Sequence, residues 1–209
     1  MKWMGYLLAV LLVTPAAGMA QSFQAGQDYQ VLDEPVSTSV DDGKVEVREF
    51  FSYACPHCNT FKPRMDSLMD EIGDRAELVY NPVVFNQSWE PLARAYHAAN
   101  ALDKVDETHG AIFQAIHGDN RRIGDADAIA DVMAEQGVDE EAFHDAWDSF
   151  SVDSAMRRAE RSARAHQVRA TPPVGVAGKY VVDVRNAGGQ ERMIEIIRYL
   201  VDKEYDDAQ

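Results

Sequence analysis

The chain has 209 residues, enough for one domain with a substantial hydrophobic core, and 46% of its residues are hydrophobic and 26% charged. This composition excludes a mainly disordered or collagen-like chain. The formal net charge of −15 argues against binding to nucleic acid or to an anionic membrane surface.

The first twenty residues, MKWMGYLLAVLLVTPAAGMA, combine one lysine with a short apolar run and small residues at the end. This pattern is typical of a secretory signal peptide, residues 1–20, cleaved after Ala20. The alternative is an uncleaved membrane anchor, although the apolar run is shorter than the ~20 residues that a spanning helix needs. A mature chain starting near Gln21 would enter an oxidising compartment, which is the periplasm in a Gram-negative bacterium.

Beyond the signal peptide, the pattern predicts a strand at Lys44–Ser52, a helix at Asn59–Ile72 and a strand at Ala76–Phe85. A helical block follows, then two strands within Pro172–Val184 joined by a turn at AGKY, and a last helix at Gln190–Tyr205. The helices predicted in the block are Pro91–Leu102, Glu107–His117, Asp125–Gln136, Glu140–Phe150 and Ser151–His166. This order indicates an α/β domain interrupted by a helical insertion.

Cys55 and Cys58, the two cysteines of the chain, lie in FFSYACPHC, where a predicted strand gives way to a helix. The unpaired amides and positive dipole end of a helix stabilise a thiolate on the first cysteine, which favours the reduced pair and makes its disulfide an oxidant. His57 can add a hydrogen bond or positive charge near Cys55, and Pro56 suits the first helical turn.

Two other interpretations of the same cysteine pair are a structural disulfide and a metal site. As a structural staple, a disulfide over so short a loop would restrict the unfolded chain little. A zinc site would need two further ligands, and there is no second pair of closely spaced cysteines and no histidine pair with ligand spacing. A non-catalytic metal carrier that uses the two cysteines with His57 stays open.

The chain resembles the DsbA-type periplasmic thiol:disulfide interchange proteins of the thioredoxin superfamily. The segments that carry the resemblance are VREFFSY, the ACPHC that follows it, the distant ATPPV and the VAGKY turn. The resemblance covers nearly the whole mature chain. It implies a thioredoxin fold formed by residues 21–83 and 167–209, with an inserted all-helical domain at residues 84–166. It implies no cofactor and no metal.

The resemblance also assigns roles to single residues. Cys55 would be the nucleophile, Cys58 its buried partner and Pro172 a cis-proline facing them, while the backbone of Thr171 would pair with a substrate peptide. Glu49 matches an acidic residue that can assist proton transfer, with an ordinary strand carboxylate as the alternative. Lys62 stands where the best-known members carry a second acid, which questions any proton network of two carboxylates.

The function implied is a periplasmic dithiol oxidase that donates its Cys55–Cys58 disulfide to newly exported, unfolded proteins with free thiols. A DsbB-like membrane quinone reductase would then reoxidise the pair. A disulfide isomerase or reductase is the alternative within redox chemistry, although the segment before the first strand is too short for the dimerisation domain that DsbC-like isomerases carry. We also expect a monomer, and the sequence leaves the clients, the reduction potential and the pKa of Cys55 open.

Overall fold

A computed structural model describes residues 22–208, so the predicted signal peptide lies outside the described residues. Five strands form one mixed sheet in the order β1-β5-β4-β2-β3, with β2 parallel to β3 and the other pairs antiparallel. The strands are β1 (Gln30–Val31), β2 (Val45–Phe51), β3 (Ala76–Pro82), β4 (Val174–Val176) and β5 (Tyr180–Val182). The sheet brings the two distant ends of the chain together, because β2 pairs with β4.

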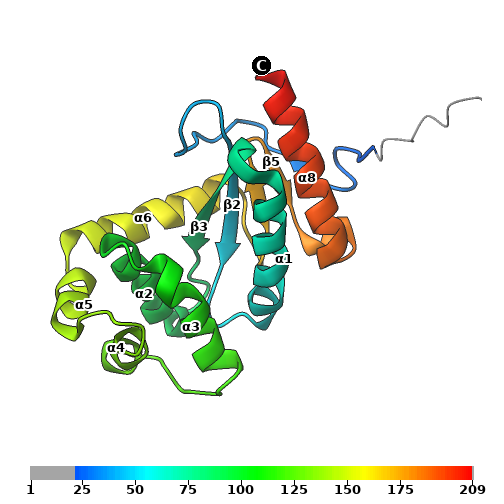
Figure 1. Cartoon of the computed structure of the whole chain (residues 1–209). Coiled ribbons are helices and arrows are strands. Elements are labelled where there is room, and N and C mark those ends of the chain that lie inside the picture. The colour runs from blue at the N-terminus through cyan, green and yellow to red at the C-terminus, as the bar shows by residue number, and fades with distance from the viewer. Residues whose placement is uncertain (1–21, 209) are drawn as a thin grey trace, which may run out of the picture.

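Helices α1 (Pro56–Ile72) and α8 (Gln190–Asp207) pack against each other and against the sheet, whereas α6 (Phe150–Ala165) contacts β3. Figure 1 shows α1 and α8 on one side of the strands and α6 on the other. The buried faces of α1 and α8 form one core with the strands, and it includes Phe61, Met65, Ile197 and Leu200. These residues recur at helical spacing, which is why the sequence pattern located both helices.

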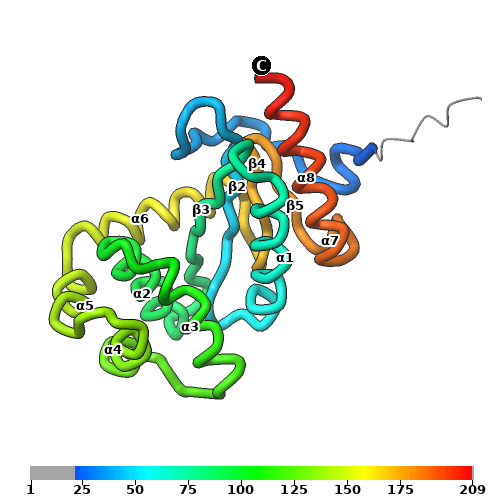
Figure 2. The backbone as a smooth tube through the Cα atoms, in the orientation of Figure 1, coloured from blue at the N-terminus to red at the C-terminus, as the bar shows by residue number. Residues whose placement is uncertain are grey.

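A second hydrophobic core lies among the helices that connect β3 to β4. In chain order these helices are α2 (Glu90–Ala101), α3 (Val105–His117), α4 (Ala126–Ala134) and α5 (Glu140–Trp147), followed by α6. In Figure 2 these helices gather beside the sheet, at the end where β2 leads into α1. Asp125 and Asp139 cap α4 and α5 by accepting hydrogen bonds from backbone amides. The predicted architecture, an α/β fold with a helical insertion, is confirmed.

Short elements complete the described chain: the 3₁₀ turns η1 (Gly73–Arg75) and η2 (Gln87–Trp89) and the helix α7 (Val184–Ala187). The predicted AGKY hairpin turn is present, with Ala177 at φ 54° and Gly178 at φ 62°. Positive φ at both central positions is what a two-residue hairpin with the right-handed twist requires. No helix among residues 22–208 has a stretch long and apolar enough to cross a membrane.

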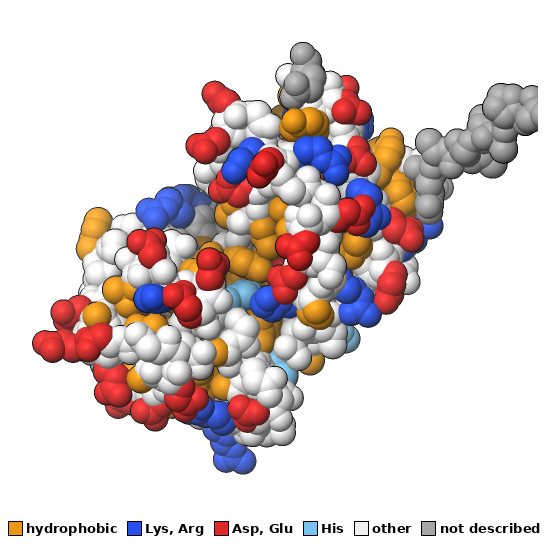
Figure 3. Space-filling model, viewed as in Figure 1, with side chains coloured by type: hydrophobic (Ala, Val, Ile, Leu, Met, Phe, Trp, Pro, Cys, Tyr) orange, Lys and Arg blue, Asp and Glu red, His pale blue; other side chains and the backbone are white. Residues whose placement is uncertain are grey.

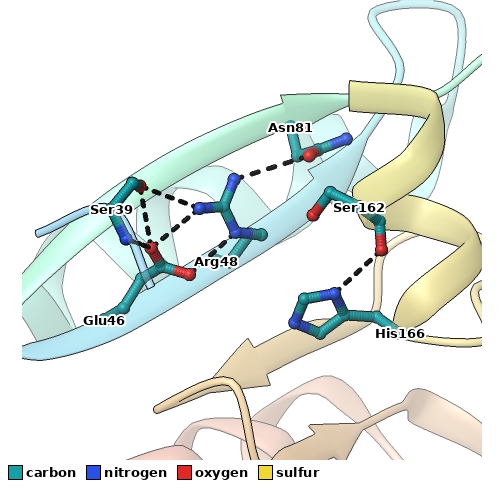
Figure 4. Close-up of polar contacts among 6 residues, drawn as sticks. All are labelled: Ser39, Glu46, Arg48, Asn81, Ser162 and His166. Carbon is teal, nitrogen blue, oxygen red and sulfur yellow. Dashed lines mark hydrogen bonds and ion pairs between the residues drawn. The ribbon is translucent and has the colours of Figure 1, made fainter. Parts of the chain in front are cut away.

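A buried polar cluster joins β2, β3 and the segment before β2 (Figure 4). Arg48 donates two hydrogen bonds to the buried carboxylate of Glu46 at 2.8 and 2.7 Å and one to Ser39 at 2.9 Å. Asn81 on β3 donates to the carbonyl of Ala159 on α6 at 3.2 Å. The cluster therefore anchors α6 to the sheet and neutralises the buried charge of Glu46.

Candidate redox site

The cysteine pair lies at the junction of β2 and α1. Cys55 is the N-cap of α1, and its Sγ accepts a hydrogen bond from the amide of Cys58 at 3.4 Å. Pro56 occupies the first helical position, where a missing amide costs little. Both cysteines are free thiols here, with Cys55 6% and Cys58 0% exposed. Cys55 is therefore the more accessible of the two cysteines.

The two thiols have opposite acidities. The hydrogen bond from Cys58 lowers the pKa of Cys55 most, and the Thr171 side chain and the backbone amides of Cys58 and His57 add to it, so that the pKa falls from 9.0 to about 5 despite burial. Burial, first, and the bond to Cys55 raise the pKa of Cys58 far above the usual range. At neutral pH the pair thus holds one thiolate, on Cys55, and one thiol, on Cys58.

Thr171 lies beside Cys55, in the loop that precedes β4. The Thr171–Pro172 peptide bond is cis, as the resemblance implies, and the carbonyl oxygen of Thr171 lies 3.7 Å from the Sγ of Cys55. The same loop borders a cavity of about 300 Å³ lined by Val168, Thr171, Pro172 and Val181, among others. The sequence alone could not bring this loop to the cysteines.

Glu49 lies under the site on β2, 2% exposed, and one of its carboxylate oxygens has no hydrogen-bond partner in the described part of the chain. Burial, first, and the negative charge of Asp66 raise its pKa to about 8, against an opposing effect of Lys62. Lys62 pairs with Asp66 at 2.6 Å. The carboxyl of Glu49 is therefore largely protonated at pH 7.

His57 is exposed, and its contacts in the structure are made by the backbone. Its carbonyl accepts hydrogen bonds from Thr60 at 3.1 Å and from Gln190 at 2.8 Å, and its amide helps to stabilise the Cys55 thiolate. The predicted effect of the His57 imidazole on Cys55 stays a prediction. Gln190, at the start of α8, was not anticipated, since nothing in the sequence places it beside the first turn of α1.

Two histidines of α3 hold Tyr53, which precedes Cys55 by two residues. The Tyr53 hydroxyl lies 2.9 Å from Nδ1 of His109, and Nε2 of His117 donates to the Tyr53 carbonyl at 2.8 Å. Burial lowers the pKa of His109 to about 3, so this histidine is neutral. In the sequence, these two histidines were notable only because they lack the spacing of metal ligands. In the structure they connect the helical insertion to the loop between β2 and Cys55, which we call the redox loop.

The comparisons with known proteins agree with this geometry. A family model described as a DSBA-like thioredoxin domain matches residues 46–194. The chain belongs to this DsbA-like family. The matched residues include both cysteines and the cis Thr171–Pro172 bond, and the match confirms the thioredoxin-like fold class.

The thiol:disulfide interchange protein DsbA of Pseudomonas aeruginosa is 32% identical over 198 residues, covering 95% of this chain and 93% of that protein. The protein of the same name from Burkholderia cepacia is 36% identical over 180 residues, covering 83% of this chain and 85% of that protein. The crystal structure of Pseudomonas aeruginosa DsbA superposes with a TM-score of 0.82 at 33% identity, covering 89% of this chain and 96% of that one. These DsbA-like relatives match across nearly the whole described chain.

Proposed function

We propose that this protein is a periplasmic dithiol oxidase that donates a Cys55–Cys58 disulfide to newly exported, unfolded proteins. Family membership supports a thiol:disulfide oxidoreductase, and the lowered pKa of Cys55 supports the direction of transfer. An ordinary thiol is protonated at pH 7, whereas a thiol with a pKa of about 5 is ionised. This ionisation stabilises reduced Cys55 by about 2.7 kcal/mol relative to an ordinary thiol. That gain favours the reduced pair by roughly 60 mV, which makes the disulfide the stronger oxidant.

In the proposed reaction, a substrate thiolate attacks the Sγ of Cys55 in the Cys55–Cys58 disulfide, and Cys58 leaves with the electron pair. A second substrate thiolate then attacks the substrate sulfur of the mixed disulfide, and Cys55 leaves as a stabilised thiolate. The substrate has lost two electrons and the enzyme holds them as one thiolate and one thiol. A low pKa makes Cys55 a good leaving group in the second step.

Each site residue has a proposed role in this cycle. Cys58 takes up the proton when it is released, because its own pKa is far above neutral. Glu49 lies close enough to affect Cys58 electrostatically and titrates near neutral pH, which suits a proton relay. Thr171 and Pro172 would align the substrate peptide, and Pro56 and His57 would shape the first turn of α1.

The cellular context is proposed on the same basis. Residues 1–20 would direct the chain to the periplasm as a monomer, and residues 84–166 would form an inserted helical domain. A DsbB-like membrane quinone reductase would reoxidise the pair without a cofactor bound to this chain. Within the described residues, no group of three or more histidine, cysteine, aspartate or glutamate side chains is placed to hold a metal ion.

The purified, oxidised protein should introduce disulfides into a reduced, unfolded substrate, with the loss of substrate thiols equal to the thiols gained by the enzyme. Cys55→Ser should abolish the reaction. Retained activity in Cys55→Ser would refute the proposed function, and a preference for reducing or reshuffling substrate disulfides would favour the isomerase or reductase alternative.

A further inference from the structure

A second cavity lies away from the cysteines, between α6, the end of α2, β3 and the segment before β2. We call it the α6 cavity, and its volume is about 760 Å³. Figure 3 shows the surface hollowed between the sheet and the helical insertion, with basic side chains over α6. The volume is within the range of small-molecule sites.

The charge of the α6 cavity is opposite to that of the chain. Arg48, Arg158 and Arg161 line it, and no aspartate or glutamate is among its described lining residues. Glu46 neutralises Arg48, whereas the exposed Arg158 and Arg161 have no hydrogen-bond or ion-pair partner within residues 22–208. Two unpaired guanidinium groups thus border one cavity in a chain with a formal net charge of −15.

These two arginines can act together. Arg158 and Arg161 are three residues apart on α6, so their side chains leave the same face of the helix. A guanidinium presents a planar fork of donors that fits the two oxygens of a carboxylate. The pair is therefore suited to one anionic group rather than to two separate ion pairs.

Deeper in the α6 cavity, the lining offers a polar group without a partner. His97 on α2 is 9% exposed, and its Nε2 has no hydrogen-bond partner among the described residues. A buried polar atom without a partner is costly, and a ligand that supplies one offsets the cost. The lining also includes the apolar and aromatic side chains of Val79, Tyr80 and Tyr96, together with polar ones such as Asn100 and Ser162.

We propose that the α6 cavity binds a small organic carboxylate, with its charged group at Arg158 and Arg161 and its apolar body against β3 and α2. The apolar and aromatic part of the lining favours an organic carboxylate over a bare inorganic anion, which would leave that part uncovered. This site is separate from the cysteine pair and does not depend on the proposed function.

Phenylacetate is a suitable probe, because it joins a carboxylate to an aromatic body. Added to the ¹⁵N-labelled, oxidised protein, it should shift the NMR signals of the Arg158 and Arg161 side chains and of the Val79 amide. Phenylacetamide, which has the same shape without the charge, should bind at least about tenfold more weakly. Inorganic phosphate should also bind more weakly than phenylacetate.

The matched variants are a double substitution at the cavity, R158Q with R161Q, and a control on the same helix, R157Q with R164Q. Both remove two positive charges from exposed positions of α6, but Arg157 and Arg164 are not among the residues that line the α6 cavity. The cavity variant should weaken phenylacetate binding about tenfold or more, and the control should change it less than about twofold.

Five outcomes would overturn the proposal: equal losses in both double variants, equal binding of phenylacetamide, equal or tighter binding of phosphate, shifts confined to the Thr171–Pro172 loop, or no shifts with millimolar phenylacetate. The amide spectrum of each variant, recorded without ligand, verifies that the fold is retained. Because the oxidase assay is independent of these measurements, failure here leaves the proposed function standing.

Discussion

The Sγ of Cys55 lies 3.7 Å from the carbonyl oxygen of Thr171, although 116 residues separate them in the chain. The pairing of β2 with β4 produces this proximity, since Cys55 follows β2 and Thr171 precedes β4. The whole helical insertion lies between them in sequence. The redox centre is thus assembled from two distant segments, and only one of them carries the cysteines.

Because the two cysteines differ in burial and acidity, substituting one or the other should have different effects on mixed-disulfide formation. Cys58→Ser should keep a nucleophilic Cys55, so a substrate disulfide should trap it as a stable mixed disulfide. Cys55→Ser should form little of this adduct, because Cys58 is fully buried and protonated. Mass spectrometry after mixing each variant with an oxidised model peptide measures the adduct, and comparable yields from both variants would contradict the assignment.

Glu49 predicts a pH dependence of stability. Its folded pKa, about 8, is above its unfolded value of 4.5, so its contribution is fully present below about pH 4.5 and is lost as the pH rises through about 8. At pH 7 the burial of Glu49 therefore lowers the free energy of unfolding by about 3 kcal/mol, compared with a neutral side chain at the same position. Glu49→Gln should therefore raise the free energy of unfolding at pH 7 by about that amount.

Denaturant unfolding of wild type and Glu49→Gln at pH 4.5 and pH 8 measures this difference. The gain should be small at the lower pH and largest at the higher one. A gain that does not change with pH would show that Glu49 is already ionised in the fold.

How far could the sequence predict the structure? The long elements were predictable because their apolar residues repeat at helical or strand spacing, as on α8. The apolar spacing alone predicts α1 only from Asn59, three residues after its start at Pro56, because the capping group is the sulfur of Cys55, which is not among the usual capping residues. β1 was missed because two residues carry no periodicity, and only its pairing with β5 defines it.

The site was predictable in the same uneven way. Cys55, Pro56 and Cys58 lie within four consecutive residues, so the motif shows them directly. The contact between Tyr53 and His109 spans 56 residues and depends on how α3 packs, which no local pattern reports. The resemblance supplied Thr171, Pro172 and Glu49, whereas the acidity of Glu49 follows from its burial in the fold.

The Tyr53 contacts predict that the helical insertion stabilises the redox loop. Tyr53→Phe should lower the free energy of unfolding by about 1 to 3 kcal/mol, because it leaves Nδ1 of buried His109 without its partner. Tyr205→Phe is a control, since that hydroxyl has no hydrogen-bond partner within residues 22–208, and it should change stability by less than about 0.5 kcal/mol. Equal effects in the two variants would mean that the buried bond contributes nothing.

In the hairpin turn between β4 and β5, replacing Gly178 should destabilise the fold more than replacing a glycine with open space around it. A Cβ at Gly178 would lie 1.9 Å from the carbonyl oxygen of Val36, and the residue also has φ 62°. Gly178→Ala should therefore cost about 2 to 5 kcal/mol, from backbone strain and the clash together. Gly188→Ala separates the two causes: φ is 81° there but nothing lies within 4 Å, so the cost should be about 1 to 2 kcal/mol.

The central claim is that Cys55 is a thiolate at neutral pH, and titration of the reduced protein tests it most directly. The ultraviolet absorbance of the thiolate reports Cys55 alone, because the pKa of Cys58 is raised far above the range in which the protein can be titrated. We predict a single transition with a midpoint near pH 5. A midpoint at the ordinary thiol value, about 8.5, would contradict the account.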